Sequence, residues 1–110
     1  MAYGDGIAAL ADPTRRAVFE RLRRGPRPVV EIARGLPVSR PAVSQHLRVL
    51  EEAGLVRKRR EGTRHFYSVN GDGVEELREY FEEFWQDALD AFKAAAESTP
   101  KGEHDEPPDD

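Results

Sequence analysis

The chain contains no cysteine. Disulfides, thiolate nucleophiles and all cysteine-based metal sites are therefore excluded. Long apolar runs are also absent, so no segment is expected to cross a bilayer. Residues 1–12 have neither the basic nor the apolar region of a signal peptide, and we expect a cytoplasmic chain with no membrane partner.

Residue constellations typical of enzymes are missing as well. There is no glycine-rich loop to hold a phosphate, and no set of Ser, His and Asp has a supporting context. The carboxylate pairs Glu82/Glu83 and Asp87/Asp90 fall on an exposed face of a predicted helix, where no cleft would shift their pKa values. The histidines lie far apart in the sequence, without metal-ligand spacing: His46, His65 and His104. We expect no enzyme, no cofactor and no metal site, and we interpret His46 as a partly buried packing residue.

The charges of the chain are segregated along its length. Residues 1–70 hold 14 Lys/Arg against 7 Asp/Glu, a net charge of +7, whereas residues 71–110 hold 3 against 14, a net charge of −11. This asymmetry indicates that the front of the chain meets a polyanion, although solvated surface charge would explain it too. With 110 residues and only 38% hydrophobic residues, the core is thin for a monomer, so oligomerisation would help to stabilise it.

Capping, proline and glycine signals divide the chain into helices and strands. Asp12-Pro13 begins a helix, Gly54 ends one, and the glycine within 61–64 marks a hairpin turn. The predicted helices are Asp5–Ala11, Thr14–Arg24, a short one from Pro28, Ser39–Ala53 and Val74–Glu97, the last with Asp72 as candidate cap. The predicted strands are Leu55–Arg60 and His65–Val69. Residues 99–110 lack apolar side chains other than proline, which predicts an ordered domain at 1–98 and a disordered acidic tail.

The order of helix, tight turn, capped helix and hairpin predicts a winged helix-turn-helix. In this motif the second helix enters the major groove of double-stranded DNA. Val43, Leu47 and Leu50 recur at a helical spacing and should face the core. The residues that then face outward include types that read base edges: Arg40, Pro41, Ser44, Gln45 and Arg48. Ser39 is expected to cap the helix, with a hydroxyl that also reaches a phosphate.

Basic side chains crowd the predicted hairpin. They are Arg57, Lys58, Arg59, Arg60 and Arg64, with the potentially basic His65. Such side chains neutralise DNA phosphates and release counterions, and Gly62 allows the hairpin tip to turn tightly. The alternative interpretation is structural: charged side chains on an exposed edge hairpin prevent it from pairing with other chains.

The last predicted helix carries an apolar stripe opposite an acidic face. Its large side chains recur at spacings of three and four, and small Ala88 would let two helices approach closely. We interpret this stripe as a dimer seam that also contacts the first helix, although it could instead line a ligand pocket. The predicted dimer interface comprises Ile7, Leu10, Leu77, Phe81, Phe84, Trp85, Ala88 and Phe92.

Two stretches, ALADPTRRAVFERL and VVEIARGLPVSRPAVSQHLRVLEEAGLVRKRREGTRHFYSV, closely resemble the ArsR-type winged helix-turn-helix repressors. The resemblance covers residues 5–97. It implies a homodimer formed through the first and last helices, which represses transcription from inverted-repeat operators near promoters. It also carries a recognition role to Ser39, Arg40, Pro41, Ser44, Gln45 and Arg48, and a wing role to Arg59, Gly62 and Arg64.

The chain departs from the metal sensors of that family. The segment PVVEIARGL lacks their paired cysteines, and the last helix has Asp87 and Asp90 but no histidine. The chain resembles the non-metal branch, whose last helix is Ala-rich and contains Trp; its small-molecule effector is unknown. We expect a mainly α fold with a two-stranded β-hairpin wing and a long C-terminal dimerisation helix. The expected function is sequence-specific DNA binding as a repressor; the alternatives are a protein-interaction module on the same fold and a ligand-gated sensor.

Overall fold

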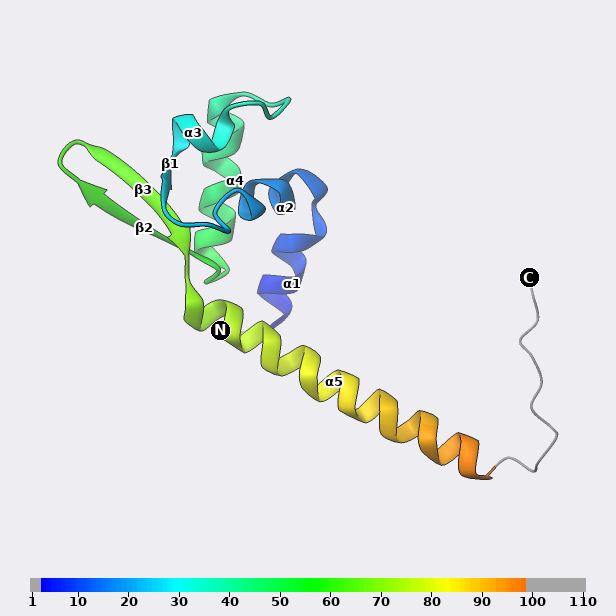
Figure 1. Ribbon diagram of the computed structural model, residues 1–110. Coiled ribbons are helices and arrows are strands. Elements are labelled where there is room, and N and C mark those ends of the chain that lie inside the picture. Colours follow the sequence, from blue (N-terminus) through cyan, green and yellow to red (C-terminus); the bar gives the residue numbers. More distant parts are fainter. Residues whose placement is uncertain (1–2, 99–110) are drawn as a thin grey trace. The chain divides into compact units, whose positions relative to one another are not determined.

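The computed structural model describes residues 3–98 (Figure 1). The chain divides into two units after Arg78. The elements are α1 (Tyr3–Ala11), α2 (Pro13–Glu20), β1 (Arg27–Pro28), α3 (Val29–Ala33), α4 (Arg40–Glu52), β2 (Val56–Glu61), β3 (Arg64–Val69) and α5 (Gly71–Ser98). None of the helices in 3–98 is both long and apolar enough to cross a membrane. The predicted acidic tail at 99–110, with His104, lies outside the described residues.

The first unit is built around a small core to which every one of its helices contributes. The core side chains with no more than 1% exposure are Val18, Leu22, Ile32, Val43, Leu47, Leu50 and Leu55. The core also includes Ala9 of α1, Ala53 after α4, Val56 of β2, Tyr67 of β3 and Leu77 of α5. This arrangement confirms the mainly helical winged helix-turn-helix that the sequence predicts.

Helix α2 begins as predicted but ends earlier. The Asp12 carboxylate accepts hydrogen bonds from the backbone N–H groups of Thr14 (2.8 Å) and Arg15 (3.0 Å). The bond from Arg15 is the main cause that lowers the pKa of Asp12, so the cap is lost only when the pH falls below the usual range of a carboxyl group.

The prediction that this second helix continues to Arg24 is wrong. Beyond Glu20, the N–H groups of Leu22 and Arg23 bond to carbonyls three residues back rather than four (3.0 and 3.1 Å), which tightens the chain into turns. Gly25 then reverses the direction of the chain with a positive φ of 139°.

The sheet has a third strand that sequence reasoning missed. Strand β1 pairs antiparallel with β3, Arg27 opposite Tyr67 and Pro28 opposite Phe66, which gives the order β1-β3-β2. Pro28 was expected to start the third helix, but it lies in β1 and α3 begins at Val29. Proline fits here because an edge strand does not require its missing N–H.

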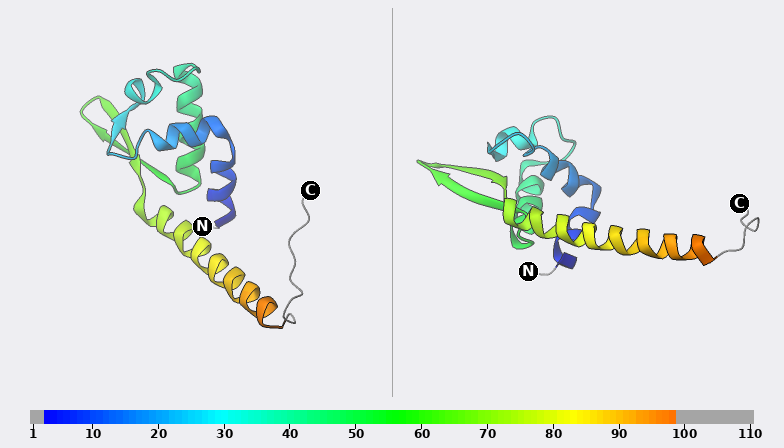
Figure 2. Two further views of the ribbon diagram at one scale, coloured as in Figure 1. Left: turned by 45° about the vertical axis from the view of Figure 1, so that its right-hand side comes forward. Right: turned by 60° about the horizontal axis from the view of Figure 1, so that its bottom comes forward.

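The start of α5 is fastened to the start of the wing by Asn70. The Asn70 side-chain amide donates to the Gly54 carbonyl (3.0 Å), and its oxygen accepts from the Asp72 backbone (3.3 Å) and from Arg57 (2.7 Å). The expected cap, Asp72, is therefore wrong, and α5 begins at Gly71, directly after β3 (Figure 2). Gly73 is buried against the Gly54 carbonyl so closely that a Cβ atom would overlap it.

The substitution Gly73→Ala should therefore destabilise the protein by about 2–3 kcal/mol, because the new methyl group forces α5 away from the turn at Gly54. Gly71→Ala, in the same helix, has open space around the added Cβ and should be neutral or stabilising by up to about 1 kcal/mol. Urea unfolding of both variants measures the difference. Equal stabilities would show that the close approach is not a constraint.

Candidate nucleic-acid interface

Helix α4 presents one buried and one exposed face. Val43, Leu47 and Leu50 are fully buried, as their spacing predicts. The sequence-predicted reading residues all lie on the exposed side of this helix or at its start: Ser39, Arg40, Pro41, Ser44, Gln45 and Arg48. The neighbouring His46 is half-buried, and its Nδ1 atom has no hydrogen-bond partner within residues 3–98.

The first turn of α4 is held in a regular geometry. Ser39 is the N-cap in extended conformation, and its hydroxyl accepts a hydrogen bond from the Ala42 N–H at 3.2 Å. Pro41 follows in the first turn, where a helix needs no proline N–H. The side chains at this end of α4 thus project from a capped, regular turn.

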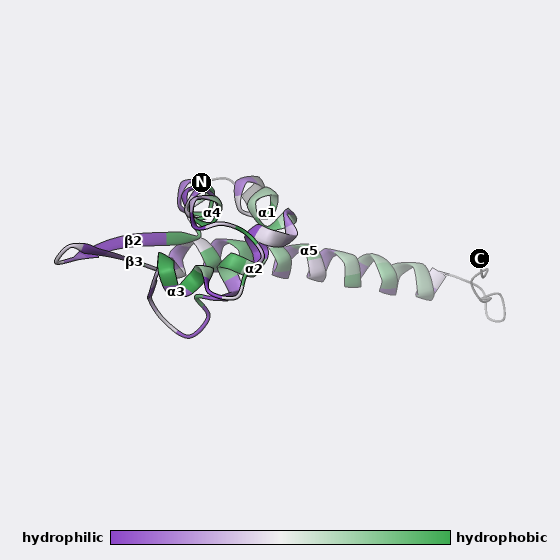
Figure 3. Ribbon diagram, turned by 90° about the horizontal axis from the view of Figure 1, so that it is seen from above, coloured by the Kyte–Doolittle hydropathy of each residue, from purple (hydrophilic) through white to green (hydrophobic). Residues whose placement is uncertain are grey.

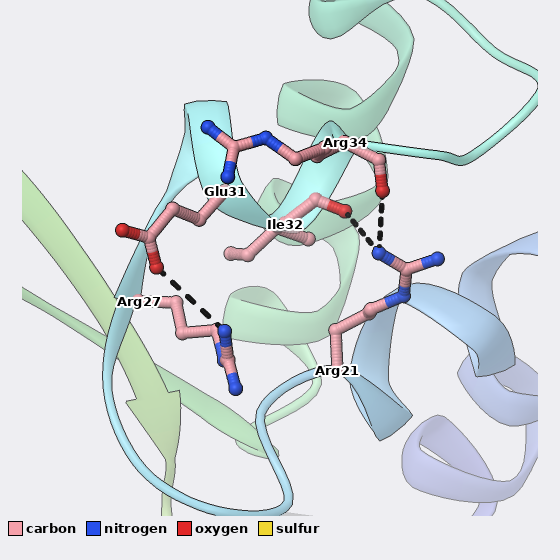
Figure 4. Close-up of polar contacts among 5 residues, drawn as sticks. All are labelled: Arg21, Arg27, Glu31, Ile32 and Arg34. Atoms are coloured by element: carbon pink, nitrogen blue, oxygen red, sulfur yellow. Dashed lines mark hydrogen bonds and ion pairs between the residues drawn. The ribbon is translucent and has the colours of Figure 1, made fainter.

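The turn before α4 is tied to α2 by a single guanidinium group. Arg21 Nη1 donates to the carbonyl oxygens of Arg34 (2.6 Å) and Ile32 (3.5 Å), where α3 ends (Figure 4). Gly35 continues the turn with a φ of +83°. Since α3 packs on α4, these bonds help to hold the two helices of the motif in place. The sequence contains no signal for this contact, because Arg21 and Arg34 lie on different elements.

The hairpin of β2 and β3 forms the wing. Its strands pair from Val56 opposite Val69 to Glu61 opposite Arg64, and Gly62 and Thr63 form the tip. Gly62 has a φ of +64° and Thr63 has no positive φ, as in a type II′ turn. Figure 3 shows hydrophilic colouring along most of β2. The six basic side chains predicted for the wing are all exposed: Arg57, Lys58, Arg59, Arg60, Arg64 and His65.

Some wing side chains are already oriented by neighbours. Arg59 Nη2 lies 3.2 Å from a Glu61 carboxylate oxygen, a pair that is well exposed and so contributes little to stability. Arg64 stacks over the Phe66 ring at 5.3 Å from its centroid.

A groove of about 230 Å³ connects the wing with the start of α4. It is lined by Arg40, Arg64 and His65 together with Pro28, Val29 and Val30. The structure thus brings together Arg40 and Arg64, two predicted DNA contacts that lie 24 positions apart in the sequence. Val30, which is 39% exposed, was not predicted to belong here, since an apolar residue in a short helix gives no sign of its exposure.

The predicted dimer residues fall into two groups. Leu77 is 9% exposed and lies in the core of its own protomer, and Leu10 is half-buried against that core. By contrast Phe81, Phe84, Trp85 and Phe92 are 51–70% exposed, Ile7 is 36% exposed, and Ala88 is exposed as well.

Within residues 3–98, His, Asp and Glu side chains form no group of three that could hold a metal ion.

Comparisons with known proteins agree with this architecture. Residues 10–59 match a family model described as a helix-turn-helix domain. The HTH-type transcriptional regulator Rv2034 of Mycobacterium tuberculosis is 52% identical over 90 residues, 82% of this chain and 84% of that protein. An ArsR-like transcriptional regulator from Rhodococcus sp. RHA1 superposes with a TM-score of 0.72 at 32% identity, over 88% of this chain and 94% of that one. A homodimeric winged helix-turn-helix DNA-binding domain from Mycobacterium bovis, a possible ArsR-family regulator, superposes with a TM-score of 0.61 at 31% identity. The match covers 80% of this chain and 82% of that one.

The cap on α4 leads to a stability prediction. Ser39→Ala should lower the free energy of unfolding by about 1 kcal/mol, because the Ala42 N–H loses its acceptor. Ser39→Thr, which keeps a hydroxyl, should recover most of this loss. Ser44→Ala serves as the matched control on the exposed face of α4 and should change stability by less than about 0.5 kcal/mol. Denaturant titrations of the three variants would contradict the cap if Ser39→Ala and Ser44→Ala behaved alike.

Proposed function

The chain belongs to the ArsR family of winged helix-turn-helix transcriptional regulators, and we propose that it acts as a homodimeric repressor that binds an inverted-repeat operator. It is a DNA-binding regulator and not an enzyme. Residues 1–98 would form the DNA-binding and dimerisation domain. An operator that overlaps a promoter would exclude RNA polymerase while the dimer occupies it.

The observation that carries the proposal is the groove shared by α4 and the wing. Arg40 at the start of α4 and Arg64 in β3 line the same groove, so one DNA backbone could contact both elements at once. The apolar wall at Val29 and Val30 suits a deoxyribose, and the cations suit the adjacent phosphates. His65 is a further candidate phosphate contact in this groove.

We assign different tasks to the two elements. The exposed Arg40, Ser44, Gln45 and Arg48 would read base edges, because α4 is the recognition helix and their side chains are free of the core. Arg59 and Arg64, with the tight turn at Gly62, would contact phosphates and add affinity that is independent of sequence. Ser39 and Pro41 would shape the first turn of the helix that approaches the DNA.

Selection of the full chain against a random duplex pool should enrich an inverted repeat, and variants should then separate the two tasks. Gln45→Ala should cost about 1–3 kcal/mol of discrimination at one base position of each half-site. Arg59→Ala should weaken binding to all sequences alike and reduce the salt slope of log K by about one per contact. Binding measured by fluorescence anisotropy across a salt series gives both quantities. If both variants lost affinity equally on every sequence, this division would be refuted.

The dimer is supported by the exposed apolar side chains of α5. Four large aromatic side chains that are 51–70% exposed within a span of 12 residues are unusual for a monomer. The relative from Mycobacterium bovis is described as homodimeric. We therefore propose that Phe81, Phe84, Trp85, Ala88 and Phe92 meet a second copy, together with Ile7 and Leu10 of α1. Two recognition helices would then reach half-sites about 34 Å apart.

The substitution Trp85→Glu should convert the dimer to a monomer, because a carboxylate would be buried in the apolar dimer interface at a cost of at least about 2 kcal/mol. Trp85 is 62% exposed in the protomer, so the fold itself should persist. Asp87→Ala, on the acidic face of the same helix, should leave the dimer intact. Sedimentation equilibrium measures the change, and a Trp85→Glu protein that stayed dimeric would place the seam elsewhere.

A further inference from the structure

A second basic concave surface, the arginine hollow, lies at the end of α2, and none of its lining residues is assigned to DNA. It has a volume of about 380 Å³ and opens to solvent. Its charged lining comprises Arg21, Arg23, Arg24, Arg27 and Glu20. Four arginines and only one acidic residue thus contribute to the lining of one concave space.

The early end of α2 creates this concentration of charge. In a helix continued to Arg24, arginines at 21, 23 and 24 would spread around the helix axis. Instead the chain turns after Glu20, and Gly25 directs it into β1, so that Arg27 joins the same hollow. The turn after Glu20, and not the sequence spacing alone, therefore brings these arginine side chains to one surface.

Most of this charge is available to a ligand. The guanidinium groups of Arg23 and Arg24 are exposed and have no hydrogen-bond or ion-pair partner among residues 3–98. Arg27 Nη1 lies 3.6 Å from a Glu31 carboxylate oxygen, and both side chains are about 40% exposed, which makes a weak pair (Figure 4). Arg21 differs, because it donates to the two carbonyls where α3 ends.

We propose that this arginine hollow binds a small phosphate-bearing anion that weakens DNA binding. The planar guanidinium fork matches two phosphate oxygens, and several such forks converge here. The volume lies within the range of about 300–1,000 Å³ that is typical of small-molecule sites. The lining comes from α2, the connection to β1, β1 itself and the turn before α4. It includes none of the side chains assigned to base or phosphate contacts.

Arg21 provides the physical link to the recognition helix. A phosphate on its other donors draws the guanidinium toward the hollow and weakens the bonds to the carbonyls of Ile32 and Arg34, which help to hold the turn before α4. The loosened turn reduces DNA affinity, and this regulatory part of the proposal rests on the proposed function.

Isothermal titration of the full chain with inorganic pyrophosphate, without DNA, tests the site itself. We expect one anion per protomer, and an affinity that falls by about tenfold or more in the double variant Arg23→Ala/Arg24→Ala. Glu20→Gln should tighten binding several-fold, because it removes the carboxylate that lines the hollow and repels the anion. The matched control Lys58→Ala/Arg60→Ala removes two charges from the wing and should keep the wild-type affinity for pyrophosphate. Absence of binding, or equal binding by the arginine double variant, would overturn the proposal.

A second arm measures duplex affinity at constant ionic strength with and without pyrophosphate. The wild type should lose affinity several-fold, whereas Arg23→Ala/Arg24→Ala should bind the duplex normally and ignore pyrophosphate. If that variant instead bound all duplexes more weakly, with a smaller salt slope, the hollow would be a DNA-backbone contact and the proposal would be wrong. If the protein bound pyrophosphate but no DNA, the anion site would be supported and only its regulatory role would be refuted.

Discussion

The burial of one face of α4 is the constraint on which the rest of the structure depends. Val43, Leu47 and Leu50 are fully enclosed by α2, α3 and the start of the wing, so the helix cannot rotate about its axis without exposing them. The opposite face, with Gln45 and Arg48, is therefore directed into solvent by the core. A reading surface needs this rigidity, because side chains discriminate bases only when their positions are fixed.

The basic residues divide according to what surrounds them. Arg40 at the start of α4 and Arg64 of the wing line a groove with apolar walls, a surface suited to the sugar and phosphate of DNA. Those at the end of α2 line a separate hollow, next to the hydrogen bonds of Arg21 that hold the turn before α4. Net charge describes neither arrangement, because the acidic C-terminal third reverses the sign of the whole chain.

Within residues 3–98, several of the polar contacts that connect the elements stand at the ends of helices. Asp12 and Ser39 satisfy N–H groups at helix starts, Arg21 satisfies carbonyls at a helix end, and Asn70 joins the wing to α5. Helix ends leave backbone groups unpaired, so side chains placed there both stabilise the helix and set its direction. In a domain with a thin core, these contacts help to hold α4 and the wing relative to each other.

Local features of the sequence determined helix α4, the β2–β3 hairpin and the exposed face of α4. A repeat at i, i+4 and i+7, a serine cap and a glycine stop each act within a few residues, so the face carrying Gln45 could be predicted without coordinates. Only the tertiary structure decided the pairing of Arg27 with Tyr67, the close approach of Gly73 to Gly54, and the convergence of Arg40 and Arg64 on one groove. These contacts join residues 19 to 40 positions apart, and their energy depends on packing that no local pattern encodes.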